Sequence, residues 1–139
     1  MIKLNTDTLL YIAALEKTSG TRVKDCIVTD TEIIYIVDEE NLGKAIGKNG
    51  QHANKIRNAL GKQVRIIGFN ADPQKFTRNL IGLVEPKSII LEETETEKHI
   101  IVESDYKTHS SIRGKHGKKL KIVRDLLKRH HNVDDVILK

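Results

Sequence analysis

The sequence is poor in cysteine and in aromatic residues. Among its 139 residues it has one cysteine, Cys26, no tryptophan, three tyrosines and two phenylalanines. A single cysteine cannot form an internal disulfide, so the chain does not follow the disulfide-stapled plan of small secreted domains. The apolar neighbours Ile27 and Val28 indicate that Cys26 is a buried thiol on a strand and not a reactive nucleophile.

Long apolar runs are also lacking. No segment approaches the roughly 18 consecutive apolar residues that a membrane span needs. The start of the chain, Met1 to Asn5, lacks the apolar region of a secretory signal. The hydrophobic content of 38% suits a folded, soluble protein. We therefore expect an intracellular, cytoplasmic protein without a membrane partner.

Acidic residues are missing from two stretches of the chain. None lies between Asn41 and Ala71, where there are six lysines and arginines, and only Asp125 lies between Lys107 and His131, where there are nine. The acids gather elsewhere, most densely in the run Glu92–Glu97, although the net charge is only +5. Such a separation of charge predicts basic surfaces that attract a phosphate-bearing partner. The alternative is two solvated helix faces on a basic protein.

What the sequence does contain is a repeated glycine loop. Gly47-Lys48-Asn49-Gly50 recurs as Gly114-Lys115-His116-Gly117, at a spacing of 67 residues (114 − 47). The register around the loops also matches. Ile33-Ile34 falls on Ile100-Ile101, Asp38 on Asp105, and Ala53, Ile56 and Leu60 on Leu120, Val123 and Leu127. One Gly-x-x-Gly is a weak signal, but two copies in the same context predict a duplicated module.

Periodicity and turn signals predict the same element order in both halves. In the first half we expect a helix that ends near Gly20, strands over 24–28 and 32–37, helices over 41–46 and 51–60, and a strand over 64–69. In the second half we expect a helix over 73–84, strands over 87–92 and 98–103, helices over 107–113 and 118–130, and a strand over 133–138. The prediction is an α+β protein with two domains, residues 1–70 and 71–139.

The glycine loops have the chemistry of an anion site. Glycine lets the backbone turn sharply and approach a ligand closely, and the helix that follows presents unpaired N–H groups and the positive end of its dipole. Lys48 and Lys115 add positive charge at the loop tip, while Asn49 and His116 can hydrogen-bond a sugar or a phosphate. The alternative is that each loop is only a tight turn between two helices.

The order helix-strand-strand-helix-GxxG-helix-strand resembles the KH domain in its prokaryotic, type II form. Ala45-Ile46-Gly47-Lys48-Asn49-Gly50 is a close match to the family's loop signature. In the second copy, Arg113 stands where the family usually has an aliphatic residue. The resemblance implies two tandem type II KH domains, each with a three-stranded sheet and its helices packed on one face. KH domains bind single-stranded RNA or DNA, and their loop clamps the backbone of about four nucleotides.

The resemblance also implies which residues contact RNA. The expected contacts are Ile46, Gly47, Lys48, Asn49, Gly50, Lys55, Arg57, Arg113, Gly114, Lys115, His116, Gly117, Lys118 and Lys121. In the family the bases lie in an apolar groove beside the loop. Here that groove would involve Ile46, Ile56, Val64 and Ile66, then Ile112, Val123 and Val133. For most of these apolar residues, packing in the core is the simpler interpretation.

Two directly joined type II KH domains are similar to the RNA-binding core of the NusA family of transcription elongation and termination factors, in its short archaeal form. This similarity implies that the partner is single-stranded RNA, with RNA polymerase or the transcription elongation complex as a further candidate. We expect the protein to be a monomer. A role in ribosome assembly, RNA processing or decay stays open, because type II KH domains occur there too.

The sequence does not favour catalysis, a cofactor or a metal. Gly43 to Asn49 superficially resembles a phosphate-binding loop, but only three residues separate the glycines where four are required, and Asn49 replaces the Ser or Thr that would hold magnesium. His130-His131 is the only pair of histidines, and adjacent residues point in different directions on a helix, so they make a poor chelate. We expect no enzyme activity, no cofactor and no metal site.

Overall fold

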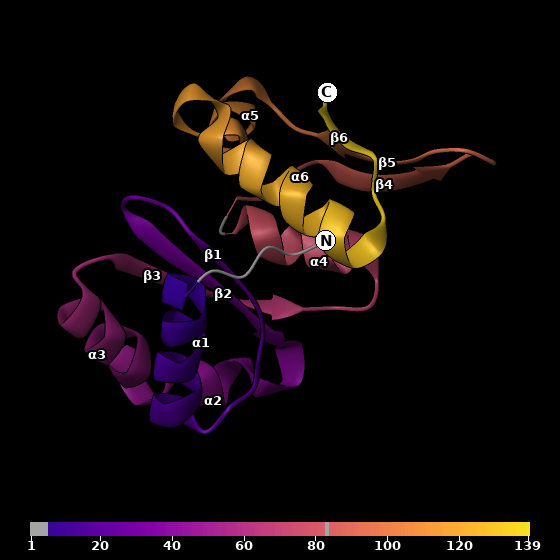
Figure 1. Cartoon of the computed structure of the whole chain (residues 1–139). Coiled ribbons are helices and arrows are strands. Elements are labelled where there is room, and N and C mark those ends of the chain that lie inside the picture. Colours follow the sequence, from indigo (N-terminus) through magenta and orange to yellow (C-terminus); the bar gives the residue numbers. More distant parts are fainter. Residues whose placement is uncertain (1–5, 83) are drawn as a thin grey trace. The chain divides into compact units, whose positions relative to one another are not determined.

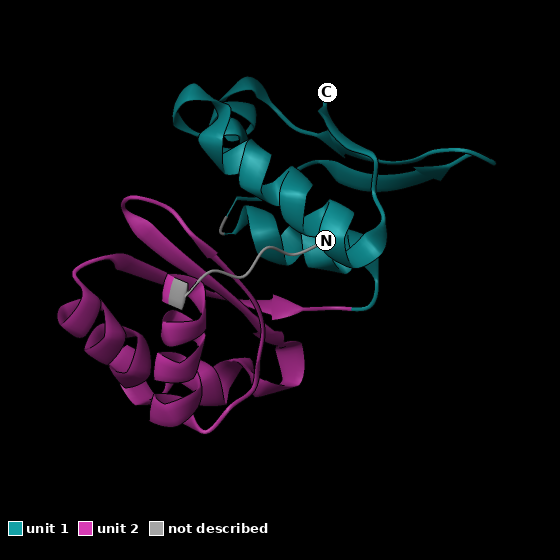
Figure 2. Cartoon of the chain, viewed as in Figure 1, with its two compact units in different colours: residues 1, 71–139 teal, residues 2–70 magenta. Residues whose placement is uncertain are grey.

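We describe the protein from a computed structural model that covers residues 6–82 and 84–139. The chain forms two compact units that meet in sequence between Asn70 and Ala71. We call the part up to Asn70 the N-terminal unit (magenta in Figure 2) and the part from Ala71 the C-terminal unit (teal). Within the described residues, no helix has the length and apolar character needed to cross a membrane.

The N-terminal unit is a three-stranded sheet with helices on one face (Figure 1). Its elements are α1 (Thr6–Ser19), β1 (Val23–Val28), β2 (Glu32–Asp38), α2 (Leu42–Ile46), α3 (Gln51–Leu60) and β3 (Gln63–Phe69), with short 3-10 turns at Glu39–Asn41 and Lys48–Gly50. The strand order is β1-β2-β3. Strand β2 is antiparallel to β1 and parallel to β3, so the sheet is mixed.

The C-terminal unit repeats this arrangement. Its elements are α4 (Pro73–Ile81), β4 (Ser88–Glu93), β5 (Lys98–Glu103), α5 (Tyr106–Arg113), α6 (Lys118–His131) and β6 (Asp135–Leu138), with a 3-10 turn at Lys115–Gly117. The strand order is β4-β5-β6, with β5 antiparallel to β4 and parallel to β6. The predicted α+β class and the repeated element order are therefore confirmed.

The core of the N-terminal unit lies between the sheet and its helices. Alternate residues of β2, namely Ile33, Tyr35 and Val37, pack in one buried cluster with Leu15 of α1 and Ile56 of α3. The buried hydroxyl of Tyr35 donates a hydrogen bond of 2.7 Å to the carbonyl of Tyr11. This alternation is what a strand with one face toward helices requires.

Cys26 belongs to the same cluster, as its neighbours in the sequence indicated. Its side chain is 4% exposed. Burial, together with the negative charge of Asp25, raises the pKa of the Cys26 thiol to about 12. The thiol therefore stays protonated and unreactive at neutral pH.

Capping residues set the ends of the helices in the C-terminal unit. Asp72 accepts a hydrogen bond of 2.9 Å from the backbone N–H of Gln74, and Pro73 occupies the first turn of α4. We expected α4 to run to Val84, but it ends at Ile81, because Gly82 has a φ of 84° that is incompatible with a helix. Residue 83, within the predicted range, lies outside the described residues.

Candidate nucleic-acid interface

The two glycine loops have the same backbone conformation. Gly47 (φ 80°, ψ 169°) and Gly114 (φ 73°, ψ 177°) begin the turns. Asn49 (φ 56°, ψ 27°) and His116 (φ 58°, ψ 25°) take equivalent left-handed positions. Both turns are closed by a hydrogen bond from the fourth residue to the first carbonyl, at 3.1 Å for Gly50 to Gly47 and 3.3 Å for Gly117 to Gly114. The sequence repeat is thus a repeat of geometry.

Glycine is needed at the first position of each loop for two reasons. The backbone there lies in a region of φ and ψ that is essentially restricted to glycine. In addition, a β-carbon on Gly47 would come within 2.7 Å of His52 Nδ1, and one on Gly114 within 2.5 Å of Lys119 Cβ. The last glycines, Gly50 and Gly117, also have positive φ but meet no such close contact.

Each loop leads directly into the N-terminus of a long helix. Gly50 precedes α3 and Gly117 precedes α6, and neither helix has a side-chain cap or an acidic residue in its first turn. The backbone N–H groups there receive no capping side chain, and the helix dipole favours an anion at this end. Lys48, Asn49, Lys115 and His116 are all exposed on the loops. The arrangement can bind a phosphate group.

The remaining predicted contact residues lie near these loops in different ways. Ile46 is half-buried at the end of α2, and Arg113 is exposed at the end of α5. The other four basic residues are exposed on the two long helices: Lys55 and Arg57 on α3, and Lys118 and Lys121 on α6. Only one of the predicted basic residues, Arg113, lines the groove of the C-terminal unit.

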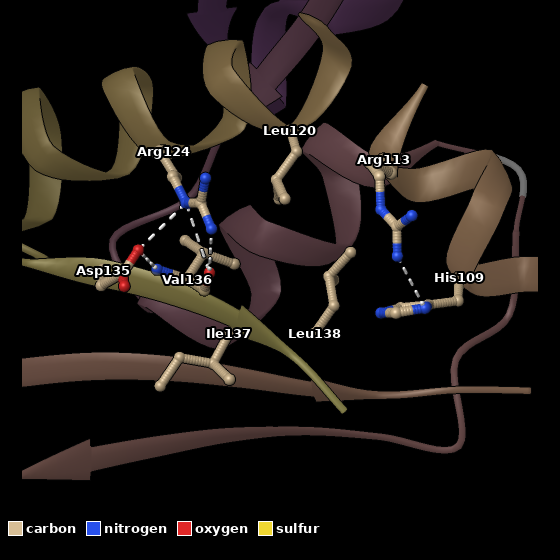
Figure 3. A pocket seen from close by; sticks show the side chains of 8 residues that line it. All are labelled: His109, Arg113, Leu120, Arg124, Asp135, Val136, Ile137 and Leu138. Atoms are coloured by element: carbon tan, nitrogen blue, oxygen red, sulfur yellow. Dashed lines mark hydrogen bonds and ion pairs between the residues drawn. The ribbon is translucent and has the colours of Figure 1, made fainter. Parts of the chain in front are cut away.

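This groove has a volume of about 330 Å³ and lies between α5, α6 and β6 (Figure 3). Its apolar part comprises Leu120, Val136, Ile137 and Leu138. Arg113 and His109 stand at one end, where Arg113 Nη2 is 3.3 Å from His109 Nδ1. Arg124 and Asp135 stand at the other end (Figure 3).

Arg124 binds the edge of strand β6. Its Nε and Nη2 donate hydrogen bonds of 3.3 and 3.1 Å to the carbonyl of Val136, and its Nε lies 3.0 Å from Asp135 Oδ1. Both charged side chains are about half exposed, so the pair contributes little to stability. Its effect is to hold the guanidinium against the wall of the groove.

The apolar residues expected in the base groove are mostly core residues. Ile56, Ile112, Val123 and Val133 are between 1% and 3% exposed, as the simpler interpretation held. Val64 and Ile66 are half-buried and pack on the core of the N-terminal unit. Sequence reasoning missed Arg124 and His109 as groove residues. The spacing of four residues in His109/Arg113 and Leu120/Arg124 was the available signal, because such pairs share a helix face.

Among the described residues, no cluster of His, Cys, Asp and Glu side chains could hold a metal ion. His130 and His131 lie in the last turn of α6, where positive charge suits the helix dipole. Both rings contact Phe76 of α4, with centroid distances of 6.0 and 5.4 Å. The two histidines therefore help to pack α4 against α6.

Comparison with known proteins identifies the class. Residues 10–69, nearly all of the N-terminal unit, match the family model of the KH domain. A solved structure, the crystal structure of a protein named APE1850, superimposes with a TM-score of 0.78 at 27% identity, over 98% of this chain and 100% of that one. The chain therefore contains a KH domain, and its two mixed sheets are consistent with two KH domains in tandem.

Full-length relatives narrow the class further. A protein from Methanocaldococcus jannaschii named probable transcription termination protein NusA is 27% identical to this chain, over 97% of this chain and 74% of the relative. The protein of that name from Thermoplasma acidophilum is 22% identical, over 99% of this chain and 96% of the relative. The chain is thus a NusA-like protein of the archaeal type.

Proposed function

We propose that this protein binds single-stranded RNA and acts in transcription elongation and termination, with both glycine loops clamping the RNA backbone. The observation that carries the proposal is the pair of loops with matching backbone angles, each presenting an exposed lysine at the start of a long helix. The names of the full-length relatives support a role in transcription.

The clamp works through backbone geometry and charge. A phosphate that enters a loop meets the uncapped N-terminus of α3 or α6 and the ammonium group of Lys48 or Lys115. Asn49 and His116 add hydrogen-bonding groups at the same tips. None of these groups reads a base, so the loops bind RNA with little dependence on sequence. The role is binding, and no catalytic step is part of the proposal.

The first test is binding of a labelled single-stranded RNA over a range of salt concentrations. The variants are Lys48→Asp with Asn49→Asp, Lys115→Asp with His116→Asp, and all four changes together. For single strands, each phosphate contact contributes roughly −0.7 to the slope of log K against log salt. We expect each pair to weaken binding and flatten the slope, and the combined variant to lose most of the affinity.

Lys17→Asp is a suitable control, because Lys17 is an exposed residue in the last turn of α1 and the variant repeats the lysine-to-aspartate exchange outside both loops. Its effect on the slope should be much smaller. If the loop variants keep the wild-type slope, the loops are structural turns and the proposal is wrong.

Co-purification with RNA polymerase would support the role in transcription, whereas co-purification with ribosomal subunits would favour ribosome assembly.

A further inference from the structure

We propose that the groove of the C-terminal unit selects guanine over adenine, because it favours a purine with a carbonyl oxygen at position 6. The inference rests on the proposed function, because it names the base that the same interface prefers. Its basis is the set of polar groups that line the groove between α5, α6 and β6 (Figure 3).

One end of the groove offers hydrogen-bond donors. Arg113 can only donate, so its contact of 3.3 Å with His109 Nδ1 requires that nitrogen to accept. The neutral ring of His109 then carries its proton on Nε2. That nitrogen is buried and has no hydrogen-bond partner in the described part of the chain. A buried N–H without an acceptor is unfavourable, and an oxygen atom from a ligand would satisfy it.

On the opposite wall of the groove, one hydrogen-bond acceptor, a backbone carbonyl, is already bound by Arg124. The carbonyl of Val136, on the edge strand β6, receives two hydrogen bonds from Arg124. Asp135 holds the same guanidinium through its Oδ1. At the end of the groove formed by His109 and Arg113, the side-chain groups left to a ligand are N–H donors.

Such a groove discriminates between bases by their edges. Adenine carries an amino group where guanine carries a carbonyl oxygen, and an amino group facing N–H donors would be left unpaired. A guanidinium can also donate two parallel hydrogen bonds to O6 and N7 of guanine. Of the two purines, guanine is thus the one whose edge can accept hydrogen bonds from Arg113 and His109.

The N-terminal unit lacks this set of donors. By the spacing of 67 residues, Leu42 stands in place of His109 and Ile46 in place of Arg113. Gln63 holds the position of Asp135 in the strand pairing, so Arg57 has no carboxylate equivalent to that of Asp135. The base selection therefore belongs to the C-terminal copy.

The test measures the affinity of the protein for oligoadenylate and for oligomers in which one adenosine at a time is replaced by inosine. This replacement exchanges the 6-amino group for a carbonyl oxygen, converts N1 from an acceptor to an N–H donor, and leaves N7 and the sugar-phosphate backbone unchanged. We expect inosine at one position to tighten binding roughly tenfold to a hundredfold. Guanosine at that position should keep the gain, because it carries the same carbonyl oxygen and N7 as inosine.

Two variants identify the residue responsible. Arg113→Ile, which copies Ile46, should abolish the gain from inosine, and Arg113→Lys, which keeps the charge but not the planar pair of donors, should lose most of the gain. If Arg113→Ile weakens all oligomers equally and the inosine gain persists, Arg113 contacts phosphate and the inference is wrong. If the protein binds oligoadenylate but inosine has no effect at any position, only base selection fails. If it binds no RNA, the proposed function fails as well.

Discussion

The first glycine of each loop has a backbone conformation that other residues rarely adopt. Gly47 and Gly114 combine positive φ with ψ near 180°, and a β-carbon at either position would contact the helix that follows. Gly43, four residues before Gly47, differs in both respects. It lies inside α2, and a β-carbon there would meet nothing within 4 Å.

These two glycines give a matched pair of substitutions. We expect Gly47→Ala to lower the free energy of unfolding by about 1–3 kcal/mol, because alanine is strained in this conformation. Gly43→Ala should raise it by about 0.5–1 kcal/mol, because alanine favours a helix more than glycine does. Urea unfolding of both variants measures the two changes, and equal effects of the same sign would contradict the geometry of the loop.

At the scale of single residues, the loop positions could be predicted from the sequence and the groove could not. The loops follow a local pattern, Gly-x-x-Gly before a helix, in which neighbours along the chain fix the geometry. His109 and Arg124 line the same groove only because α5, α6 and β6 pack together. Which face of α6 points to β6 depends on that packing, so an apolar residue such as Val123 looked equally suited to the groove.

At the scale of elements, the short helices that precede the two glycine loops differ in how their N-terminal ends are capped. Asp105 caps α5 and accepts a hydrogen bond of 2.8 Å from the backbone N–H of Thr108. Asp38, its equivalent in the repeat, makes no such side-chain bond and precedes a 3-10 turn. The hydrogen bonds from Thr108 hold the pKa of Asp105 below its ordinary value of 3.8.

This cap predicts a dependence of stability on pH. The folded state favours ionised Asp105, so its contribution to stability is complete above the unfolded pKa and is lost as the pH falls through the lowered folded pKa. Asp105→Asn keeps a capping oxygen that does not titrate. We expect wild type to lose more stability than this variant as the pH falls below about 4. Unfolding curves at several pH values test this, and parallel losses in both proteins would exclude Asp105 as the cause.

The type and order of the helices and strands followed from periodicity, and their ends from capping residues. Strand β6 starts at Asp135, two residues later than expected, because Asn132 is left-handed (φ 56°) and ends α6 after His131. Asn at such a position is common, but a single sequence does not show which Asn takes it. Strand pairing, with β6 parallel to β5, also depends on contacts between distant residues.

At the scale of the whole molecule, the two copies share the order of their elements and the conformation of the glycine loop, but differ at the groove positions. Both copies keep the glycine loop and a basic helix after it. The groove residues have diverged, from Leu42 and Ile46 in one copy to His109 and Arg113 in the other. If both loops clamp RNA as we propose, shared loops with different groove residues let the protein hold one RNA strand at two places and read a base at one of them.

Linking two RNA-binding units in one chain should increase affinity far beyond that of either unit. Once one unit is bound, the second meets the same strand at a high effective concentration, which adds roughly a hundredfold or more when both can reach it. We therefore expect the full chain to bind a long single-stranded RNA at least this much more tightly than fragments 1–70 and 71–139 added together.

The comparison needs two controls. Circular dichroism must show that each fragment keeps its helices, and an RNA of about four nucleotides, enough for one unit, should bind the full chain no more tightly than the better fragment. The gain should therefore appear only as the RNA becomes long enough for both loops. If the mixed fragments match the full chain on long RNA, the two units act separately, and the duplication serves some purpose other than a continuous grip on one strand.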